Sequence, residues 1–141
     1  MNKNGPIVII EDDEDDQQLF GEVLKELNYA NEVIFFNDGQ AALDYLTSSA
    51  KQPFLIFSDI NMPKLNGFQL RDKVHNNEKL KLKCIPYLFF TTSAQQEQVI
   101  DAYSKSVQGF FTKPTSYVDL HRVIRNIIEY WKDCHSPNAV L

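Results

Sequence analysis

The sequence predicts an α/β fold in which a doubly wound, five-stranded parallel sheet is covered by helices on both faces. Five short apolar or aromatic runs occur along the chain, and none shows the clean polar alternation of a half-exposed strand. A segment with helical spacing follows each run, so strand and helix alternate five times. The length of 141 residues and a hydrophobic fraction of 43% suit a single domain with its own core.

The predicted strands are short runs whose flanking residues include turn and loop formers. Four prolines fall at element edges or in loops, where a missing amide proton costs little: Pro53, Pro63, Pro86 and Pro114. The strands are expected at residues 7–10, 33–36, 54–57, 87–90 and 109–111. Right-handed crossovers between parallel strands restrict the topology further.

The predicted helices are marked by apolar residues three and four positions apart. The clearest extends from about Ser116 to Lys132, with its apolar stripe at Leu120, Val123, Ile124, Ile127, Ile128 and Trp131. The fourth helix opens with Ser93 and Gln96, which have the spacing of a capping box. The other three are expected from about Asp16 to Asn28, after Asn37-Asp38, and from Gly67.

The composition excludes several classes of protein. A net charge of −5 and scattered lysines and arginines argue against a nucleic-acid-binding face. No apolar stretch approaches the roughly 18 residues of a membrane span, and no leader-like segment precedes the first strand. Because Cys84 and Cys134 lack redox or metal spacing, we expect a reduced, cytoplasmic protein. The expected domain spans residues 6–132, and residues 133–141 form a short tail.

Carboxylates follow two of the predicted strands directly. Asp59 comes after the third strand, and Glu11-Asp12-Asp13 comes after the first. Since the carboxyl ends of parallel strands share one edge of a sheet, three carboxylates should converge there. Two like charges about 4 Å apart repel by roughly 4 kcal/mol at an effective dielectric constant of 20, so the cluster needs a cation or a shared proton.

The all-oxygen ligand set favours Mg²⁺ as that cation. The alternative is an acidic helix start, which stabilises a helix through its dipole and can account for Asp15 and Asp16. It does not account for Asp59, which follows another strand. Lys113 precedes Pro114 at the end of the fifth strand, and Thr91 ends the fourth. Lys113 could contact a phosphoryl oxygen as a point charge, and Thr91 adds a hydroxyl group. Taken alone, Lys113 could be a solvated charge and Thr91 a strand-end cap.

Taken together, these motifs resemble the receiver domain of two-component response regulators. The resemblance rests on the acidic pair, on Asp-Ile-Asn-Met-Pro-Lys-Leu-Asn-Gly from Asp59 to Gly67, on Thr91 and on Lys113-Pro114, and it covers about residues 6–132. It implies a flavodoxin-like (βα)5 fold with strand order 2-1-3-4-5. It also implies a signalling domain, not an enzyme, that assists its own phosphorylation and dephosphorylation.

The resemblance assigns roles to individual residues. It implies that Asp59 is the phosphoacceptor and that Thr91 and Lys113 contact the phosphoryl group. Mg²⁺ would be held by Asp12, Asp59 and the main-chain carbonyl of Asn61, with Glu11 completing the acidic pair. The register of that pair stays open, because Asp12 and Asp13 could serve in place of Glu11 and Asp12.

Further positions concern switching. Phe110 matches the family's switch aromatic and would move with Thr91, although it could equally be an ordinary core residue, with Phe111 as the buried neighbour. Thr92 stands where the family commonly has a small residue. Asn61 and Ser93 occupy the two variable positions that tune the lifetime of the acyl phosphate in the family.

The resemblance also predicts partners. A sensor histidine kinase or a phosphotransfer protein would donate the phosphoryl group, and a homodimer is compatible with this architecture. A downstream protein would bind the face formed by the fourth helix, the fifth strand and the fifth helix. Candidate contacts on that face are Gln95, Gln98, Tyr103, Phe110 and Tyr117, although the two tyrosines could equally be packed edge residues. His75, His121 and His135 have no metal-ligand spacing.

Two other functions are weighed against this prediction. The first is a phosphatase that uses Asp59 as its nucleophile, but haloacid dehalogenase-type enzymes usually carry a second acid two residues later, where this chain has Asn61. The second is an unphosphorylated binding module, but the presence of Asp59, Asp12, Thr91 and Lys113 argues against a degenerate site. Exposure to Mg²⁺ and a small acyl phosphate would separate the three functions.

Overall fold

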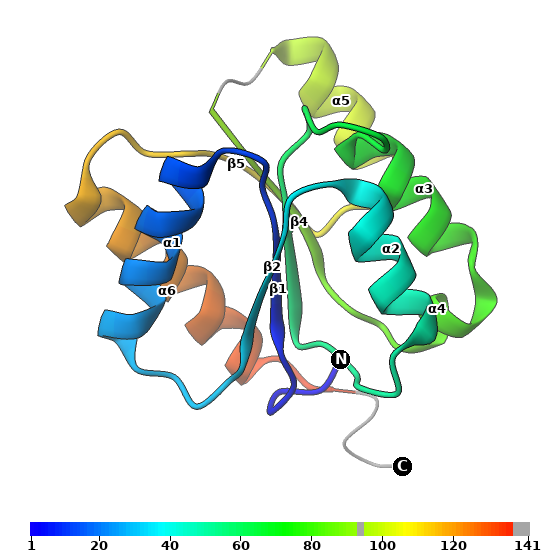
Figure 1. The fold of residues 1–141 in the computed structure, drawn as a ribbon, viewed down its shortest axis with the longest axis horizontal. Coiled ribbons are helices and arrows are strands. Elements are labelled where there is room, and N and C mark those ends of the chain that lie inside the picture. Colours follow the sequence, from blue (N-terminus) through cyan, green and yellow to red (C-terminus); the bar gives the residue numbers. More distant parts are fainter. Residues whose placement is uncertain (93–94, 137–141) are drawn as a thin grey trace.

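The computed structural model describes residues 1–92 and 95–136, and within these ranges it contains five strands and six helices (Figure 1). In chain order these are β1 (Ile7–Ile10), α1 (Glu14–Leu27), β2 (Val33–Phe36), α2 (Gly39–Ser48), β3 (Leu55–Ser58), α3 (Gly67–Asn76), α4 (Glu78–Leu82), β4 (Tyr87–Thr91), α5 (Gln96–Ser104), β5 (Gly109–Thr112) and α6 (Tyr117–Asp133). The five predicted strands and the helix that follows each of them are confirmed.

The strands form one parallel sheet in the order β2-β1-β3-β4-β5, as predicted. The registers align the strand ends, because Ile10 of β1 lies opposite Ser58 of β3, and Thr91 of β4 lies opposite Thr112 of β5. The residues that follow β1, β3, β4 and β5 therefore meet at one edge of the sheet.

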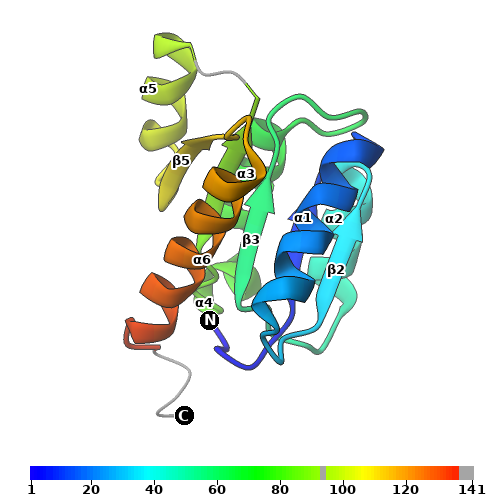
Figure 2. The same ribbon diagram turned by 90° about the vertical axis from the view of Figure 1, so that its left-hand side faces the viewer.

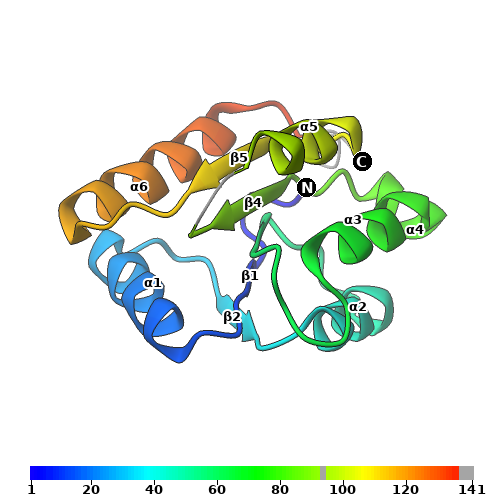
Figure 3. The same cartoon turned by 90° about the horizontal axis from the view of Figure 1, so that it is seen from above.

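Helices cover both faces of this sheet. Helices α1 and α6 pack on one face and lie in front of the sheet in Figure 2, and α2, α3, α4 and α5 lie on the other face (Figure 3). Successive residues of a strand serve the two cores in turn: in β1, Ile7 and Ile9 face the first core, and Val8 and Ile10 face the second. The central strands are buried on both sides, whereas the edge strand β2 is only half-buried.

Two helix starts differ from the expected positions. Helix α1 begins at Glu14, because the Asp13 side chain accepts a hydrogen bond from the backbone N–H of Asp16 and caps the helix there. Helix α5 begins at Gln96, and its N-cap is Gln95, whose N–H donates to the Gln98 side chain at 3.5 Å. The predicted role of Ser93 lies outside the described residues.

The short helix α4 was not predicted. Asn77 caps it by accepting a hydrogen bond from the N–H of Leu80 at 3.0 Å, and Leu80 is its only buried residue. The alternation of lysine and leucine from Lys79 to Lys83 has no helical period, so the sequence carries no signal for this helix. None of the helices in the described ranges is both long enough and apolar enough to cross a membrane.

Candidate functional site

The site lies at the edge of the sheet where β1 and β3 end. Asp59 follows β3 directly, and its backbone N–H donates to the carbonyl of Ile10 at 3.0 Å, which ties it to the end of β1. Its side chain is largely buried, with Oδ1 accepting a hydrogen bond from the N–H of Ile60 at 2.7 Å. The backbone therefore holds this carboxylate in one orientation.

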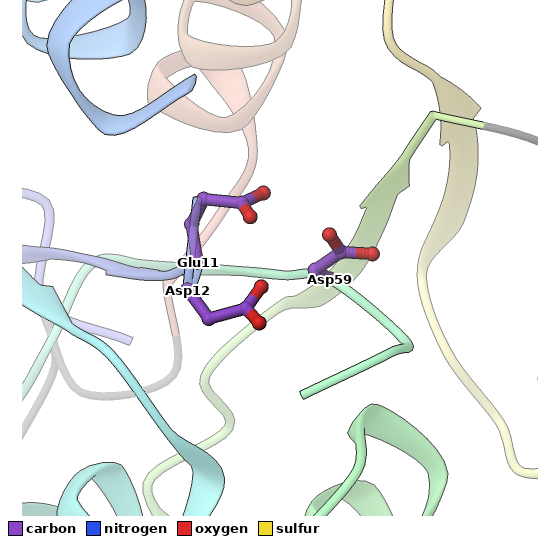
Figure 4. A group of neighbouring side chains, drawn as sticks. All are labelled: Glu11, Asp12 and Asp59. Carbon is purple, nitrogen blue, oxygen red and sulfur yellow. The ribbon is translucent and has the colours of Figure 1, made fainter. Parts of the chain in front are cut away.

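Three carboxylates from two loops share this position. Glu11, Asp12 and Asp59 each place one oxygen within 4.8 Å of the other two, and Figure 4 shows the side chains of Glu11 and Asp12 extending toward Asp59. Glu11 and Asp59 are buried, whereas Asp12 is exposed. Asp13 is occupied as the N-cap of α1, so the geometry favours Glu11 and Asp12 as the acidic pair.

Lys113, after β5, is the cation of the site. Its Nζ lies 3.3 Å from Oδ2 of Asp59 and 2.9 Å from Oδ2 of Asp16, and it also contacts Oε2 of Glu11. Burial alone would lower the pKa of Lys113, but the hydrogen bonds to Glu11 and Asp16 and the nearby negative charges outweigh burial and raise it above its ordinary value. Lys113 is therefore held in its charged form.

The carboxyl of Glu11 is under opposing influences. Burial raises its pKa to about 7, while hydrogen bonds from Lys113 and from the N–H of Asp13 act to lower it. The charge of Asp59 adds to the rise. The raised pKa of Glu11 thus reflects its burial and the neighbouring negative charge, which a bound cation would offset.

Asp16 is a site residue that the sequence analysis missed. Its carboxylate binds Lys113, which lies 97 positions away in the chain, although the sequence analysis had assigned it only to the helix start. Gln17, also missed, donates through Nε2 to the Glu11 carbonyl and to Oδ1 of Asn37 at 2.7 Å. The position of Asp16, in the first helical turn after the acidic loop, was a signal that it lies near the site. The spacing along the chain did not indicate that its partner is Lys113.

The donor set fits a hard divalent cation. All three groups supply carboxylate oxygens, and Mg²⁺ commonly takes one or two carboxylates and keeps several waters. Beneath the carboxylates lies a cavity of about 40 Å³, which Lys113 and Phe57 help to line. This volume can hold water but not a phosphoryl donor, so a donor has to approach Asp59 from the open side.

We predict that Asp12→Asn raises stability without metal and reduces the stabilisation that Mg²⁺ provides. In EDTA the free energy of unfolding of the variant should be about 0.5–1 kcal/mol higher than that of the wild type, because without metal the carboxylate of the exposed Asp12 only repels those of Glu11 and Asp59. The increase in melting temperature on adding Mg²⁺ should shrink at the same time. Thermal unfolding monitored by circular dichroism measures both effects.

The matched control is Asp15→Asn, because Asp15 is also exposed and lies in the first turn of α1 but outside the carboxylate group. It should lower stability slightly, through the helix dipole, and leave the response to Mg²⁺ unchanged. An equal loss of the Mg²⁺ response in both variants would contradict the assignment of Asp12.

The loop from Asp59 to Gly67 is closed by its own backbone. The N–H of Gly67 donates to the carbonyl of Ile60 at 2.8 Å, and the hydroxyl of the buried Tyr87 donates to the Gly67 carbonyl at 3.2 Å. A Cβ at Gly67 would lie 2.3 Å from the carbonyl oxygen of Asp59. Only glycine therefore lets α3 start this close to the acidic residue.

We predict that Gly67→Ala destabilises the protein by about 1–3 kcal/mol, since the added methyl group overpacks a backbone contact that cannot shift freely. Urea unfolding measures the change. Gly21→Ala in α1 is the control, because its added Cβ would meet only the Phe35 ring at an ordinary distance of 3.6 Å. That variant should be neutral or more stable by up to about 1 kcal/mol, and equal losses in both would refute the explanation.

The other predicted site residues lie around this centre. Thr91 is buried at the end of β4, and its carbonyl accepts a hydrogen bond from the N–H of Lys113 at 2.6 Å. Thr92 and Asn61 are exposed. Phe110 is half-buried in β5, with its ring 6.0 Å from that of Phe89, and it packs against the core beneath α5.

The predicted partner face maps onto α5, β5 and α6, because α4 is an additional helix. On α5, Gln95 and Tyr103 are exposed and Gln98 is half-buried. Tyr117 fits the alternative of a packed edge residue, because its hydroxyl donates to Glu26 of α1 at 2.7 Å, on the opposite side of α6. This hydrogen bond directs its ring toward α1, and we remove Tyr117 from the predicted face.

Comparison with known families places these features in context. The family model of the response regulator receiver domain matches residues 7–125 of this chain. Response regulator Rcp1 of Synechocystis is 32% identical over 130 residues, which cover 89% of this chain and 87% of Rcp1. Chemotaxis protein CheY-3 of Vibrio cholerae is 30% identical over 129 residues, covering 92% of this chain and 95% of CheY-3.

Solved structures agree with the sequence relatives. The phosphorylated cyanobacterial phytochrome response regulator RcpA superposes with a TM-score of 0.85 at 28% identity, over 94% of this chain and 97% of RcpA. The Mn²⁺-bound form of Rcp1 superposes with a TM-score of 0.81 at 31% identity, over 93% and 97% of the two chains. The family match over residues 7–125 includes all five strands and the acidic residues that follow β1 and β3.

Proposed function

Because this chain belongs to the response regulator receiver domain family, we propose that it is a single-domain response regulator whose Asp59 accepts a phosphoryl group in a Mg²⁺-dependent reaction. The observation that carries the proposal is the convergence of Glu11, Asp12 and Asp59 on one space, with Lys113 at 3.3 Å from Asp59. The donor is a sensor histidine kinase or a phosphotransfer protein.

Asp59 is the nucleophile of the proposed reaction. One of its carboxylate oxygens attacks the phosphorus, the bond from phosphorus to the donor's imidazole nitrogen breaks, and the electron pair leaves with that nitrogen, which takes up a proton from water. The hydrogen bond from the N–H of Ile60 holds the carboxylate during the attack. The product is an acyl phosphate on Asp59 and a free histidine on the donor.

The metal site is proposed for Asp12, Asp59 and the main-chain carbonyl of Asn61, with Glu11 beside them. Bound there, Mg²⁺ would offset the carboxylates and attract the phosphoryl oxygens. The all-oxygen donor set supports this choice, and the Mn²⁺-bound form of Rcp1 is a related protein that carries a divalent ion. Glu11 and Lys113 keep the rest of the pocket close to electrical balance.

Lys113 and Thr91 are proposed to contact the phosphoryl group and to respond to its charge. Lys113 already lies beside Asp59, and its backbone is hydrogen-bonded to Thr91, so the two can respond together. The added negative charge disturbs the ion pairs of Lys113 with Glu11 and Asp16, which provides the driving force for switching. Phe110 lacks a hydroxyl and would have to report the change by packing alone.

The output is proposed to be a protein contact at the face of α5, β5 and α6. Ile100 and Tyr103 of α5 are 60% and 56% exposed, which supports a surface that a partner would cover. We also propose a cytoplasmic location, in keeping with two cysteines that do not pair. Signalling proceeds by phosphorylation-dependent binding or by relay to a further protein.

The test is incubation of the purified protein with acetyl phosphate, with Mg²⁺ or with excess EDTA, followed by intact mass spectrometry. The proposal predicts one phosphoryl addition per chain with Mg²⁺ and none with EDTA. Hydrolysis of many equivalents of other phosphate esters would favour a phosphatase and overturn it. No addition under either condition would favour a passive binding module.

A further inference from the structure

A second cavity lies at the opposite end of the sheet from the acidic site. Its volume is about 410 Å³, within the range of about 300–1,000 Å³ that is typical of small-molecule sites. The segments that lead into β4 and β5 form its floor, α3 and α4 form one wall, and the end of α6 forms the other. In Figure 1, α4 and the C-terminal end of α6 lie in the lower half of the molecule.

The lining of this cavity is basic in a chain that is acidic overall. Arg71, His75, Lys81 and His135 all contribute to it, and no aspartate or glutamate is among the described residues that line it. Five of the 14 lysines and arginines fall between residues 71 and 83, with Asp72 and Glu78 as the only acids there. Fixed positive charge around a concave surface attracts anions.

Arg71 is the buried anchor of the cavity. It is 6% exposed, and its Nε and Nη2 donate to the carbonyls of Lys105 and Ser106 at 3.1 and 2.8 Å. These bonds use two of the five N–H donors of a guanidinium and fix its plane, so the other donors are pre-oriented. Burial lowers the pKa of Arg71, and a bound anion would offset that electrostatic cost.

Apolar side chains complete the walls. Leu80, Ile85 and Pro86 line the cavity, and the indole of Trp131 reaches it from α6. An inorganic ion would leave these surfaces wet, whereas an anion attached to an apolar body would cover them. The combination of one buried guanidinium, basic side chains at the rim and an aromatic wall is selective for such a ligand.

We propose that this cavity binds a small organic anion, in which a carboxylate or phosphate ester pairs with Arg71 and Lys81 and an apolar body packs against Trp131. The site is separate from the acidic centre, and the proposal does not depend on the phosphorylation of Asp59.

The chain has its own reporters for a binding test. Trp131 is the only tryptophan, and two of the three histidines, His75 and His135, line the cavity. The third, His121, lies on α6 with Nε2 3.8 Å from Glu26 and serves as an internal reference. Phenyl phosphate and benzoate are the probes, and benzyl alcohol is the neutral control, all in EDTA so that no metal attracts anions to the acidic site.

We expect phenyl phosphate or benzoate to shift the His75 and His135 NMR signals and the Trp131 fluorescence saturably, with a Kd of about 1 mM, and to leave His121 unchanged. Comparing the two probes tells whether the site prefers a phosphate ester or a carboxylate. Equal shifts with benzyl alcohol, equal shifts at His121, or no saturable response with either anion would overturn the proposal.

Variants test the assignment of residues. Arg71→Gln should weaken binding by about tenfold, because a charge-assisted contact is lost. Since Arg71 also tethers α3 to the end of α5, Lys81→Gln is the second variant; Lys81 is exposed, and its loss should weaken binding by about threefold. Lys79→Gln, on the same helix but outside the lining, should leave the Kd unchanged, and equal effects of both lysine variants would refute the site.

Discussion

Asp59→Asn should take up no phosphoryl group from acetyl phosphate and Mg²⁺, while the wild type should take up one. The substitution keeps the shape of the side chain and its acceptor for the N–H of Ile60, but it removes the anionic oxygen that attacks phosphorus. The fold should survive, because one of the three carboxylates around Lys113 is lost and less repulsion remains. Intact mass spectrometry measures the addition, and circular dichroism checks the fold.

Asp16→Asn is the matched control for this experiment. Asp16 contacts Lys113 as Asp59 does, but it is not one of the three carboxylates that share the metal position. It should still accept one phosphoryl group, at a rate changed only through Lys113. If Asp59→Asn still gained a phosphoryl group, and fragmentation located it on another acidic residue, the assignment of Asp59 as the acceptor would be wrong.

Lys113→Met should lower the free energy of unfolding in EDTA by about 3 kcal/mol, because it leaves buried carboxylates without their cation. Methionine preserves most of the alkyl stem, so the loss reports the charge more than the packing. The side chain of Lys113 is only 11% exposed and contacts Glu11, Asp16 and Asp59. Adding Mg²⁺ should restore part of the loss, since the metal then neutralises the same groups. Urea unfolding with and without Mg²⁺ gives both values.

The control is Lys51→Met, which breaks an ion pair with Glu32 at 2.7 Å in which both side chains are more than half exposed. Solvent screens such a pair, so no measurable change is expected in either condition. A similar loss of stability in both variants, or a loss in Lys113→Met that Mg²⁺ does not reduce, would show that the charge of Lys113 does not stabilise the buried carboxylates. Lys113→Met should also slow phosphorylation, which links stability and function at one side chain.

The prediction from the chain was successful where the signal is local. The central strands are continuous apolar runs, because both of their faces are buried, and the stripe of α6 repeats at three and four residues, because one face packs on the sheet. The acidic residues after β1 and β3 were expected together, since parallel strands end at a common edge. The family motif from Asp59 to Gly67 added the specific roles, which remain predictions.

Other features depended on contacts between distant residues. Asp13 could be separated from Asp12 only once it was seen to cap α1, and Asp16 joined the site only through Lys113. Helix α4 carries a single buried leucine, so no periodic pattern marks it. For Tyr117, the choice between a partner contact and a packed edge residue depended on its hydrogen bond to Glu26, which lies 91 residues earlier.

The amino-acid order alone was therefore sufficient for the fold class, the strand ends and the acidic edge, because burial on both faces and strand direction act over a few neighbouring residues. The folded chain was needed to show which carboxylates share a cation and to reveal the basic cavity, where Arg71, Lys81 and Trp131 meet from three helices. Electrostatic energy depends on distances across the fold, and these distances are not encoded in the spacing along the chain.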